Sequence, residues 1–300
     1  MRVVRLRSYA KINLGLRILG KRADGYHDIW TVFQQVSLAD ELVLETQPHQ
    51  LEVLCHHPSV AKGEENLCWR AAAALKQATG CHHGVRISVR KRIPVGAGLG
   101  GGSSNAAVVL AALNVLWGTG LKQAELMDLA ATLGSDVPFF LLGGTAVGEG
   151  RGERLTPVAL SDDYWCVVAM PNVEISTRWA YSAAKFDLTK SQKCSTFSSL
   201  AEELSDRARW PSILGNDFEQ VVFDAYPSIA TLKAELTQEG SFYCSLSGSG
   251  GAVFGLFARR DRALQARLRV AKSALAFVVR PIRWGCEGIT KAIAEQLSTA

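Results

Sequence analysis

The amino-acid sequence predicts two domains, each of which combines β-strands with α-helices. The chain has 300 residues, of which 48% are hydrophobic and 20% are charged, and this length suits two separate cores. Apolar and polar residues alternate as in a strand near the N-terminus, whereas apolar residues recur at helical spacing after a glycine-rich segment. The segment LSDD, at 160–163, is the expected boundary, so we divide the chain into domains 1–160 and 161–300.

The first predicted strand carries two polar residues that we expect to lie side by side. Every second residue over 10–18 is apolar, so Lys11 and Asn13 share the opposite face. The next segment, GKRADGYH, is rich in turn-forming residues and predicts a loop. The segments 29–38 and 40–46 then predict two further strands.

Helices and strands share the remainder of the N-terminal half. Residues 66–79 predict a helix with Asn66 as its N-cap, and GVRISVRKRIPV predicts a strand that leads into the glycine-rich loop. A buried helix is expected to begin after that loop, at Ser103–Ser104. Further elements are predicted as a helix at 122–133, a short helix within GSDVPFF, and a strand with a turn at 144–158.

The C-terminal half predicts the same mixture. We expect a strand at 164–170, helices at 217–223 and 228–239, and a strand–turn–strand unit within FYCSLSGSGGAVFGLF. The segment RRDRALQARLRVAKSAL predicts a basic amphipathic helix. We interpret its charges as a solvated helix face rather than as a nucleic-acid site.

Composition and charge argue against several classes of protein. The net charge of +5 is mild and fits an anionic small molecule, and no basic stripe interleaved with aromatic residues indicates a nucleic-acid partner. The seven cysteines are scattered and form no Cys-x-x-Cys pair, which favours reduced thiols. The sequence shows neither a signal peptide nor an apolar run of membrane-spanning length. We therefore expect a cytoplasmic protein with no membrane partner, as a monomer or a weak homodimer.

The segment GAGLGGGSS, residues 96–104, is the strongest functional signal. Its glycine spacing formally matches the dinucleotide-binding fingerprint, but a second helix follows where that fold requires a strand ending in an acidic residue. Gly102 stands where a Walker loop has its lysine, and the protein-kinase motifs His-Arg-Asp and Asp-Phe-Gly are absent from the sequence. Glycine N–H groups at a helix start still suit a phosphate group. A turn needed only for backbone geometry is the alternative.

Several motifs together resemble the GHMP kinases. The segment PVGAGLGGGSSNAA is similar to the second motif of that superfamily. The chain resembles one branch more closely, the 4-diphosphocytidyl-2-C-methyl-D-erythritol kinases. Four segments carry this likeness in the same order: AKINLGLRILGKRADGYHDI, LGSDVPFFLLGGTAVGEGRGERLTP, GNDFEQVVF and SLSGSGGAVFGLF. The resemblance extends from residue 10 to residue 257.

This resemblance implies a fold and a reaction. The fold would be the two-domain α+β GHMP kinase fold, with a ribosomal-protein-S5-domain-2-like N-terminal domain, a ferredoxin-like C-terminal domain, and the active site between them. The reaction would be the ATP-dependent phosphorylation of the 2-hydroxyl of 4-(cytidine 5'-diphospho)-2-C-methyl-D-erythritol in the non-mevalonate (MEP) isoprenoid precursor pathway, giving the 2-phosphate and ADP. Mg²⁺ is expected with ATP, because it neutralises phosphate charge.

The resemblance also assigns a catalytic pair. Asp136, within GSDVPFF, could be only the N-cap of the helix that continues at Pro138. It falls instead on the catalytic aspartate of the family, which accepts or orients the proton of the attacking hydroxyl. Lys11 falls on the lysine that keeps this aspartate ionised and contacts the hydroxyl. A solvent-facing strand lysine is the alternative role for Lys11.

Four further residues are implied to contact the substrate. Asn13 shares the strand face of Lys11, and Thr177 aligns with a substrate-contacting threonine. Tyr26 and His27 fall on the residues that recognise the cytosine, where an aromatic ring stacks on the base and an imidazole bonds its edge. A loop tyrosine that covers apolar surface is the alternative for Tyr26.

The family pattern places ATP along the glycine-rich loop. The third family motif, SLSGSGGA at 245–252, is expected to support that loop from the second domain, and Ser103 or Ser104 is the candidate ligand of Mg²⁺. Lys91 has the alternative role of a plain strand-end charge. The implied ATP-binding residues are Asn66, Leu67, Lys91, Pro94, Val95, Gly96, Ala97, Gly98, Leu99, Gly100, Gly101, Gly102, Ser103 and Ser104.

Parts of the pattern leave other functions open. A homoserine or mevalonate kinase would share the glycine-rich loop but needs no cytosine pocket, and a silent nucleotide-binding protein would not need both Lys11 and Asp136. An NAD-dependent oxidoreductase has only the formal glycine match in its favour. The Cys-His-His stretches at 55–57 and 81–83 contain zinc ligands without closed-site spacing, and we interpret them as surface loops.

Overall fold

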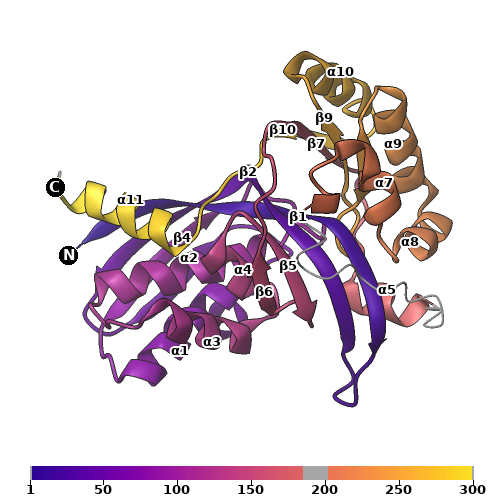
Figure 1. Cartoon of the computed structure of the whole chain (residues 1–300). Coiled ribbons are helices and arrows are strands. Elements are labelled where there is room, and N and C mark those ends of the chain that lie inside the picture. The colour runs from indigo at the N-terminus through magenta and orange to yellow at the C-terminus, as the bar shows by residue number, and fades with distance from the viewer. Residues whose placement is uncertain (1, 185–201, 299–300) are drawn as a thin grey trace.

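The computed structural model describes residues 2–184 and 202–298, which form two β-sheets with helices packed on them (Figure 1). The larger sheet has six strands in the order β3-β4-β2-β5-β6, with β1 paired to β2, and the smaller has four in the order β10-β7-β9-β8. This arrangement confirms the predicted α+β class. The strands are β1 (Val3–Lys21), β2 (His27–Gln47), β3 (Leu51–Cys55), β4 (Gly84–Arg90), β5 (Thr145–Gly150), β6 (Arg154–Pro157), β7 (Trp165–Met170), β8 (Tyr243–Leu246), β9 (Val253–Phe257) and β10 (Leu275–Val279).

β1 and β2 form a long antiparallel hairpin that reaches from the first domain to beside the second (Figure 1). The prediction of separate strands at 29–38 and 40–46 was wrong, because β2 continues through both. Asp40 suggests a polar break in the sequence, but its carboxylate is fully buried. There it accepts hydrogen bonds from the backbone N–H groups of Arg92 and Ile93, at 2.7 and 2.8 Å.

The helices of the first domain share one hydrophobic core with the larger sheet. α2 lies in the middle of this core and is buried along most of its length, as its apolar spacing predicts. The 3-10 helix η1 (Gly63–Glu65) precedes the first α-helix. These α-helices are α1 (Leu67–Thr79), α2 (Gly101–Leu116), α3 (Gln123–Leu133), α4 (Val137–Leu142) and α11 (Cys286–Ser298).

The C-terminal helix α11 departs from the expected division of the chain at residue 160. The segment 161–300 was expected to form the second domain, but α11 crosses back and packs near the N-terminus (Figure 1). The side chains of Ile289 and Ile293 are fully buried in the first core. The reason is the helical spacing of these two residues, which gives α11 one apolar face that needs a core to cover it.

The starts of α1 and α2 show how well the sequence pattern predicts where a helix begins. Asn66 caps α1 as predicted, because its side chain accepts a 2.9 Å hydrogen bond from the backbone N–H of Cys68. α2, however, begins at Gly101 rather than at Ser103–Ser104. Gly100, with φ at +68°, lets the chain turn into the helix two residues before the first serine.

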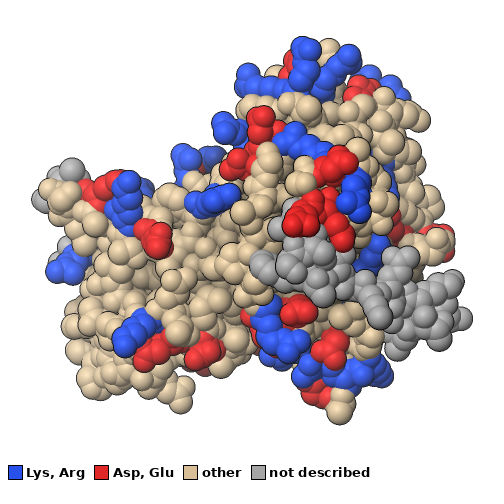
Figure 2. Space-filling view, viewed as in Figure 1, with Lys and Arg blue, Asp and Glu red and all other residues tan. Residues whose placement is uncertain are grey.

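The second domain surrounds the smaller sheet with short helices. The basic helix ends at Val270, earlier than predicted, and the chain continues into β10. Its arginines lie at the surface (Figure 2), where Arg259 pairs with Asp261 at 2.7 Å, in agreement with a solvated face. No helix within the described ranges is long and apolar enough to cross a membrane. The helices of the second domain are α5 (Thr177–Ala183), η3 (Arg207–Arg209), α7 (Trp210–Ile213), α8 (Glu219–Ala225), α9 (Pro227–Gln238) and α10 (Arg260–Val270).

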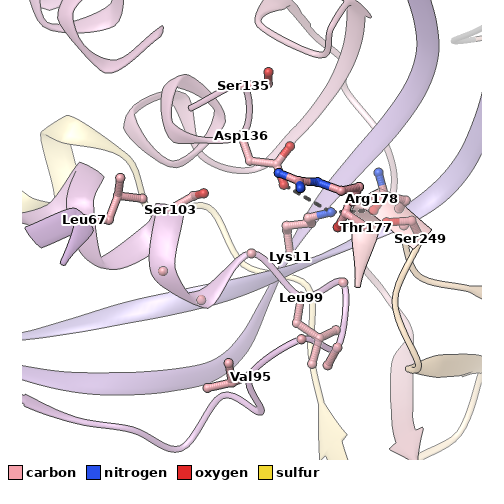
Figure 3. Close-up of a pocket in the computed structure, with 18 of the residues that line it drawn as sticks. Lys11, Leu67, Val95, Leu99, Ser103, Ser135, Asp136, Thr177, Arg178 and Ser249 are labelled. Carbon is pink, nitrogen blue, oxygen red and sulfur yellow. Dashed lines mark hydrogen bonds and ion pairs between the residues drawn. The ribbon is translucent and has the colours of Figure 1, made fainter. Parts of the chain in front are cut away.

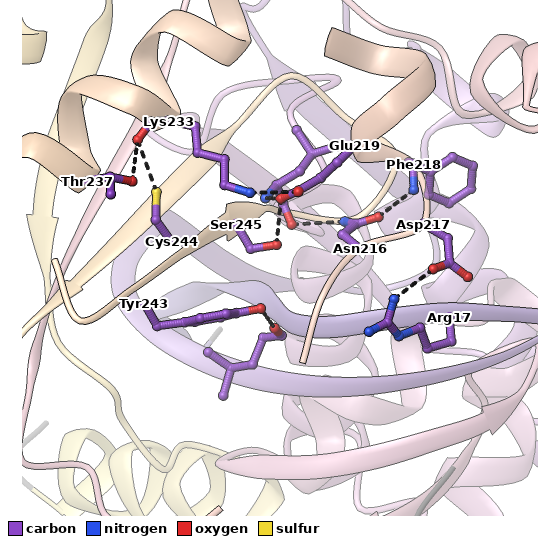
Figure 4. Close-up of polar contacts among 12 residues, drawn as sticks. Arg17, Asn216, Asp217, Phe218, Glu219, Lys233, Thr237, Tyr243, Cys244 and Ser245 are labelled. Carbon is purple, nitrogen blue, oxygen red and sulfur yellow. Dashed lines mark hydrogen bonds and ion pairs between the residues drawn. The ribbon is translucent and has the colours of Figure 1, made fainter. Parts of the chain in front are cut away.

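Polar contacts hold β1 to the second domain (Figure 4). Arg17 of β1 pairs with Asp217 at 3.0 Å, and the hydroxyl of Tyr243 donates a 2.6 Å hydrogen bond to the backbone carbonyl of Leu14. Asn216 donates to the carbonyls of Leu246 and Gly248, at 2.9 and 2.8 Å. The motif GNDFEQVVF therefore fixes both the hairpin and the loop between β8 and β9.

Replacing Ile289 by alanine tests the placement of α11. The free energy of unfolding should fall by about 2–5 kcal/mol, because the fully buried side chain leaves a cavity. Leu268→Ala on α10, where the side chain is 62% exposed, is the control and should change it by about 0.5 kcal/mol or less. Urea denaturation measures both. Equal effects of the two substitutions would contradict the packing of α11.

Candidate active site

A cavity of about 1060 Å³ lies between the two domains. Its wall is formed by β1, the β1–β2 turn, the start of α1, the glycine-rich loop, the start of α4, α5 and the β8–β9 loop. Figure 3 shows the region where Lys11, Asp136 and Thr177 lie near that loop. The chain thus brings almost all of its predicted site residues to one cavity.

Lys11 and Asp136 meet inside this cavity. The Nζ of Lys11 is 3.4 Å from the Oδ2 of Asp136 and donates a 2.6 Å hydrogen bond to the Oδ1 of Asn13. Only 5% of the Lys11 side chain is exposed, so it is not the solvent-facing strand lysine of the alternative reading. Asp136 stands at the N-cap position of α4 but makes no capping hydrogen bond with its side chain. Its carboxylate is directed to Lys11 instead.

A chain of hydrogen bonds fixes Asn13 behind this pair. Its amide group donates to the hydroxyl of Thr31 at 2.7 Å, and that hydroxyl donates to the carbonyl of Gly15 at 2.7 Å. All of these side chains are buried. Asn13 was predicted to contact substrate; it lines the cavity and also holds the ammonium group of Lys11 in place.

The glycine-rich loop is held between β1 and the second domain. The backbone N–H of Lys11 donates to the carbonyl of Leu99 at 3.0 Å, and the Ser247 hydroxyl donates to the carbonyl of Gly98 at 3.1 Å. The N–H of Ala252 donates to the carbonyl of Ala97 at 3.2 Å. The expected contact between SLSGSGGA and the glycine-rich loop is therefore present, through one side-chain hydroxyl and one backbone N–H.

The predicted nucleotide-binding residues line the cavity with one exception. Asn66, Leu67, Lys91 and the whole segment 94–103 face it. Ser104 does not, because one residue further along α2 its side chain points toward β1. There its hydroxyl forms a buried 2.7 Å hydrogen bond with that of Ser8. Of the two candidate Mg²⁺ ligands, only Ser103 therefore fits a metal ion carried by nucleotide phosphates.

Lys91 has a buried carboxylate partner. Its ammonium group is bonded to Asp40, whose other oxygen accepts the two backbone hydrogen bonds described above. Both side chains are largely withdrawn from water. Lys91 is therefore more than a free strand-end charge, because it ties the end of β4 to β2 just before the glycine-rich loop.

An aromatic group lies at the turn of the β1–β2 hairpin. Tyr26 is 56% exposed, and the ring of His27 stacks on that of Tyr181, with centroids 4.9 Å apart. Burial, with a smaller effect of Lys21, lowers the pKa of His27, so its imidazole is neutral at pH 7 and can accept a hydrogen bond. Thr177 also lines the cavity and is bonded to Ser249 at 3.2 Å.

Sequence reasoning missed three cavity residues that bear on function. Tyr181 lies one helical turn after Thr177, and this spacing was the signal that could have found it. Arg178 lines the cavity and takes part in none of the ion pairs among the described residues. Arg151, in the turn after β5, lies over the ring of Tyr26. Nothing in the local pattern marks the two arginines, because only the fold brings them to the site.

The two Cys-His-His stretches lie in loops except for Cys55, which is the last residue of β3. No group of three or more His, Cys, Asp or Glu side chains in the described part of the chain is placed to hold a metal ion.

The fold and the site together define a small-molecule kinase of the GHMP class. The family model for the GHMP kinases N terminal domain matches residues 66–144, and that for the GHMP kinases C terminal matches 197–275. The chain belongs to the family of 4-diphosphocytidyl-2-C-methyl-D-erythritol kinases. A relative of that name from Gloeobacter violaceus is 43% identical over 88% of each chain.

Solved structures agree with this assignment. A crystal structure of 4-(cytidine 5'-diphospho)-2C-methyl-D-erythritol kinase superimposes with a TM-score of 0.79 at 37% identity, covering 92% of this chain and 98% of the other. A homoserine kinase from Cytophaga hutchinsonii shares the fold, with a TM-score of 0.74 at 17% identity over 95% of this chain and 96% of the other. The predicted two-domain GHMP fold is confirmed.

Gly98→Ala tests the contact between the two loops. A Cβ at this position would lie 2.0 Å from the carbonyl oxygen of Ser247, and the φ of +78° disfavours any side chain. The KM for ATP should rise on the order of tenfold or more, because relieving this clash displaces the loop. Gly20→Ala, which meets no atom within 4 Å, is the control. An unchanged KM for ATP in Gly98→Ala would contradict a phosphate-binding loop fixed by this contact.

Proposed function

We propose that this kinase transfers the γ-phosphate of ATP to the 2-hydroxyl of 4-(cytidine 5'-diphospho)-2-C-methyl-D-erythritol, giving the 2-phosphate and ADP. One observation carries the proposal. The Lys11–Asp136 pair lies in the same cavity as the glycine-rich loop and as the aromatic group at the hairpin turn. A phosphate donor and a base-bearing acceptor can therefore both reach this pair.

Asp136 acts on the acceptor hydroxyl. Its carboxylate accepts the hydrogen bond of the hydroxyl and takes up the proton as the bond to phosphorus forms. Lys11 lies 3.4 Å away, where its ammonium group faces this carboxylate and contacts the same hydroxyl. Because Asn13 and the face of the Phe33 ring, 5.3 Å from Nζ, hold the ammonium group, the pair is in place before substrate binds.

The ATP phosphates bind without a lysine in the loop. The glycine-rich loop and the first turn of α2 line the cavity, and backbone N–H groups at such a helix start suit phosphate oxygens. Arg178, in the second domain, forms no ion pair with another described residue, so it is our candidate for the cation that the loop lacks. Ser103 would supply one oxygen to Mg²⁺, which neutralises phosphate charge when it is bound with ATP.

The cytosine binds at the hairpin turn. The exposed ring of Tyr26 offers a stacking surface, and the neutral imidazole of His27 can accept a hydrogen bond from the amino group of the base. The ring of Tyr181 stacks on the imidazole, and burial raises the pKa of Tyr181 to about 12, which keeps the phenol protonated. We place the enzyme in the cytoplasm, which the free cysteines among the described residues support.

A substrate comparison tests the proposal. Purified protein with ATP, Mg²⁺ and the cytidine-diphosphate-linked methylerythritol should release ADP, whereas homoserine and mevalonate should not, because neither carries a base. ADP release is followed with a coupled assay. If the protein released ADP with mevalonate or homoserine but not with this substrate, the proposed substrate would be wrong and the assignment as a kinase would stand.

Substitutions of the catalytic pair test the roles within it. Asp136→Ala should lower kcat by about 10²–10⁴-fold, since it removes the proton acceptor, and should leave ATP binding nearly unchanged. Lys11→Ala should also lower kcat strongly. The exposed Asp162→Ala, outside the cavity, is the control. Initial rates and calorimetric ATP titration separate the two effects. Persistent turnover in Asp136→Ala would contradict the assigned role.

A further inference from the structure

Two turns from different parts of the chain lie side by side where strands of the larger sheet end. β2 and β5 are antiparallel neighbours with Ile29 opposite Gly150, so the β1–β2 turn and the β5–β6 turn are adjacent. The second turn is fixed by its own contacts, because the backbone N–H of Arg151 donates to Glu153 Oε2 at 2.7 Å. The side chain of Arg151 crosses to the first turn, where its guanidinium carbon lies 5.2 Å from the centroid of the Tyr26 ring.

The backbone of Tyr26 is fixed, but its ring has few other partners. The N–H of Tyr26 donates to Asp24 at 3.1 Å, and its carbonyl accepts from Arg22 at 2.8 Å. The ring itself is 56% exposed. An exposed tyrosine side chain samples several rotamers, and fixing one of them costs conformational entropy when a ligand binds. A guanidinium group over one face of the ring favours one of these orientations in advance.

We infer that Arg151 is a positioning residue for the cytosine-binding Tyr26. The inference rests on the proposed function. The guanidinium covers one face of the ring and leaves the other face for the base. Both residues line the cavity, and the ion pair of Arg151 with Glu153 is long, at 3.9 Å, so Glu153 does not hold the guanidinium away from the ring. Arg151 therefore acts on substrate affinity through Tyr26 and not on phosphoryl transfer.

A double-mutant cycle tests this role. Arg151→Gln should raise the KM for the cytidine-diphosphate substrate by about three- to tenfold, the range of a partly exposed cation–π contact, with kcat and the KM for ATP unchanged. In a Tyr26→Leu background the same substitution should have no further effect, because the ring it positions is absent. Arg151→Lys should recover part of the affinity. Initial-rate kinetics measure all of these variants.

The neighbouring Arg154→Gln is the matched control, since Arg154 is exposed on β6 and does not line the cavity. Thermal denaturation of each variant shows whether it is folded. An Arg151→Gln effect of equal size with and without the tyrosine ring would overturn the inference, because Arg151 would then bind substrate directly. So would an unchanged KM in Arg151→Gln. Failure of the proposed function is distinct, because the wild-type protein itself would then not turn over this substrate.

Discussion

The burial of one positive charge, the ammonium group of Lys11, constrains the rest of the site. A lysine withdrawn from water needs polar partners, because an unpaired buried charge is strongly destabilising. Asn13 supplies one from the same strand and Asp136 supplies another from the start of α4. The backbone of Lys11 in turn holds the carbonyl of Leu99. The carboxylate of Asp136 and the glycine-rich loop therefore both meet at Lys11, before any ligand binds.

The absence of a lysine in the glycine-rich loop has a structural consequence. A Walker loop carries its own cation, so its charge balance is set within one segment. Here the cations that line the cavity come from separate elements, and three of them, Lys11, Lys91 and Arg151, already have carboxylate partners. Arg178 in α5 forms no ion pair with another described residue, and neither does Lys21 at the end of β1. In the proposed mechanism Arg178 reaches the phosphates from the second domain, so charge neutralisation depends on the two domains being held together. The close contact between Gly98 and Ser247 contributes to this.

The local sequence pattern correctly predicted the features that depend on neighbouring residues alone. The N-cap Asn66, the shared face of Lys11 and Asn13, and the loop-to-helix transition after Val95 follow from spacing and residue type. The local pattern failed where the structure depends on contacts with residues that are distant in the sequence. Asp40 could be read as a break because its partners lie about fifty residues further along the chain. Neither the direction of Ser104 nor the return of α11 to the first core can be seen without knowing which elements pack together.

Chemistry and recognition occupy different parts of the β1–β2 hairpin. In the proposed site Lys11 lies where β1 passes between the domains, whereas the aromatic group lies at the turn, beside β5 and α5. The hairpin turn contributes little to either hydrophobic core, so its residues can change without loss of the fold. A fold can host different functions when the residues of its site change, and a homoserine kinase shares this fold at 17% identity. Acceptor specificity should therefore be sought in Tyr26, His27 and the side chains that orient them.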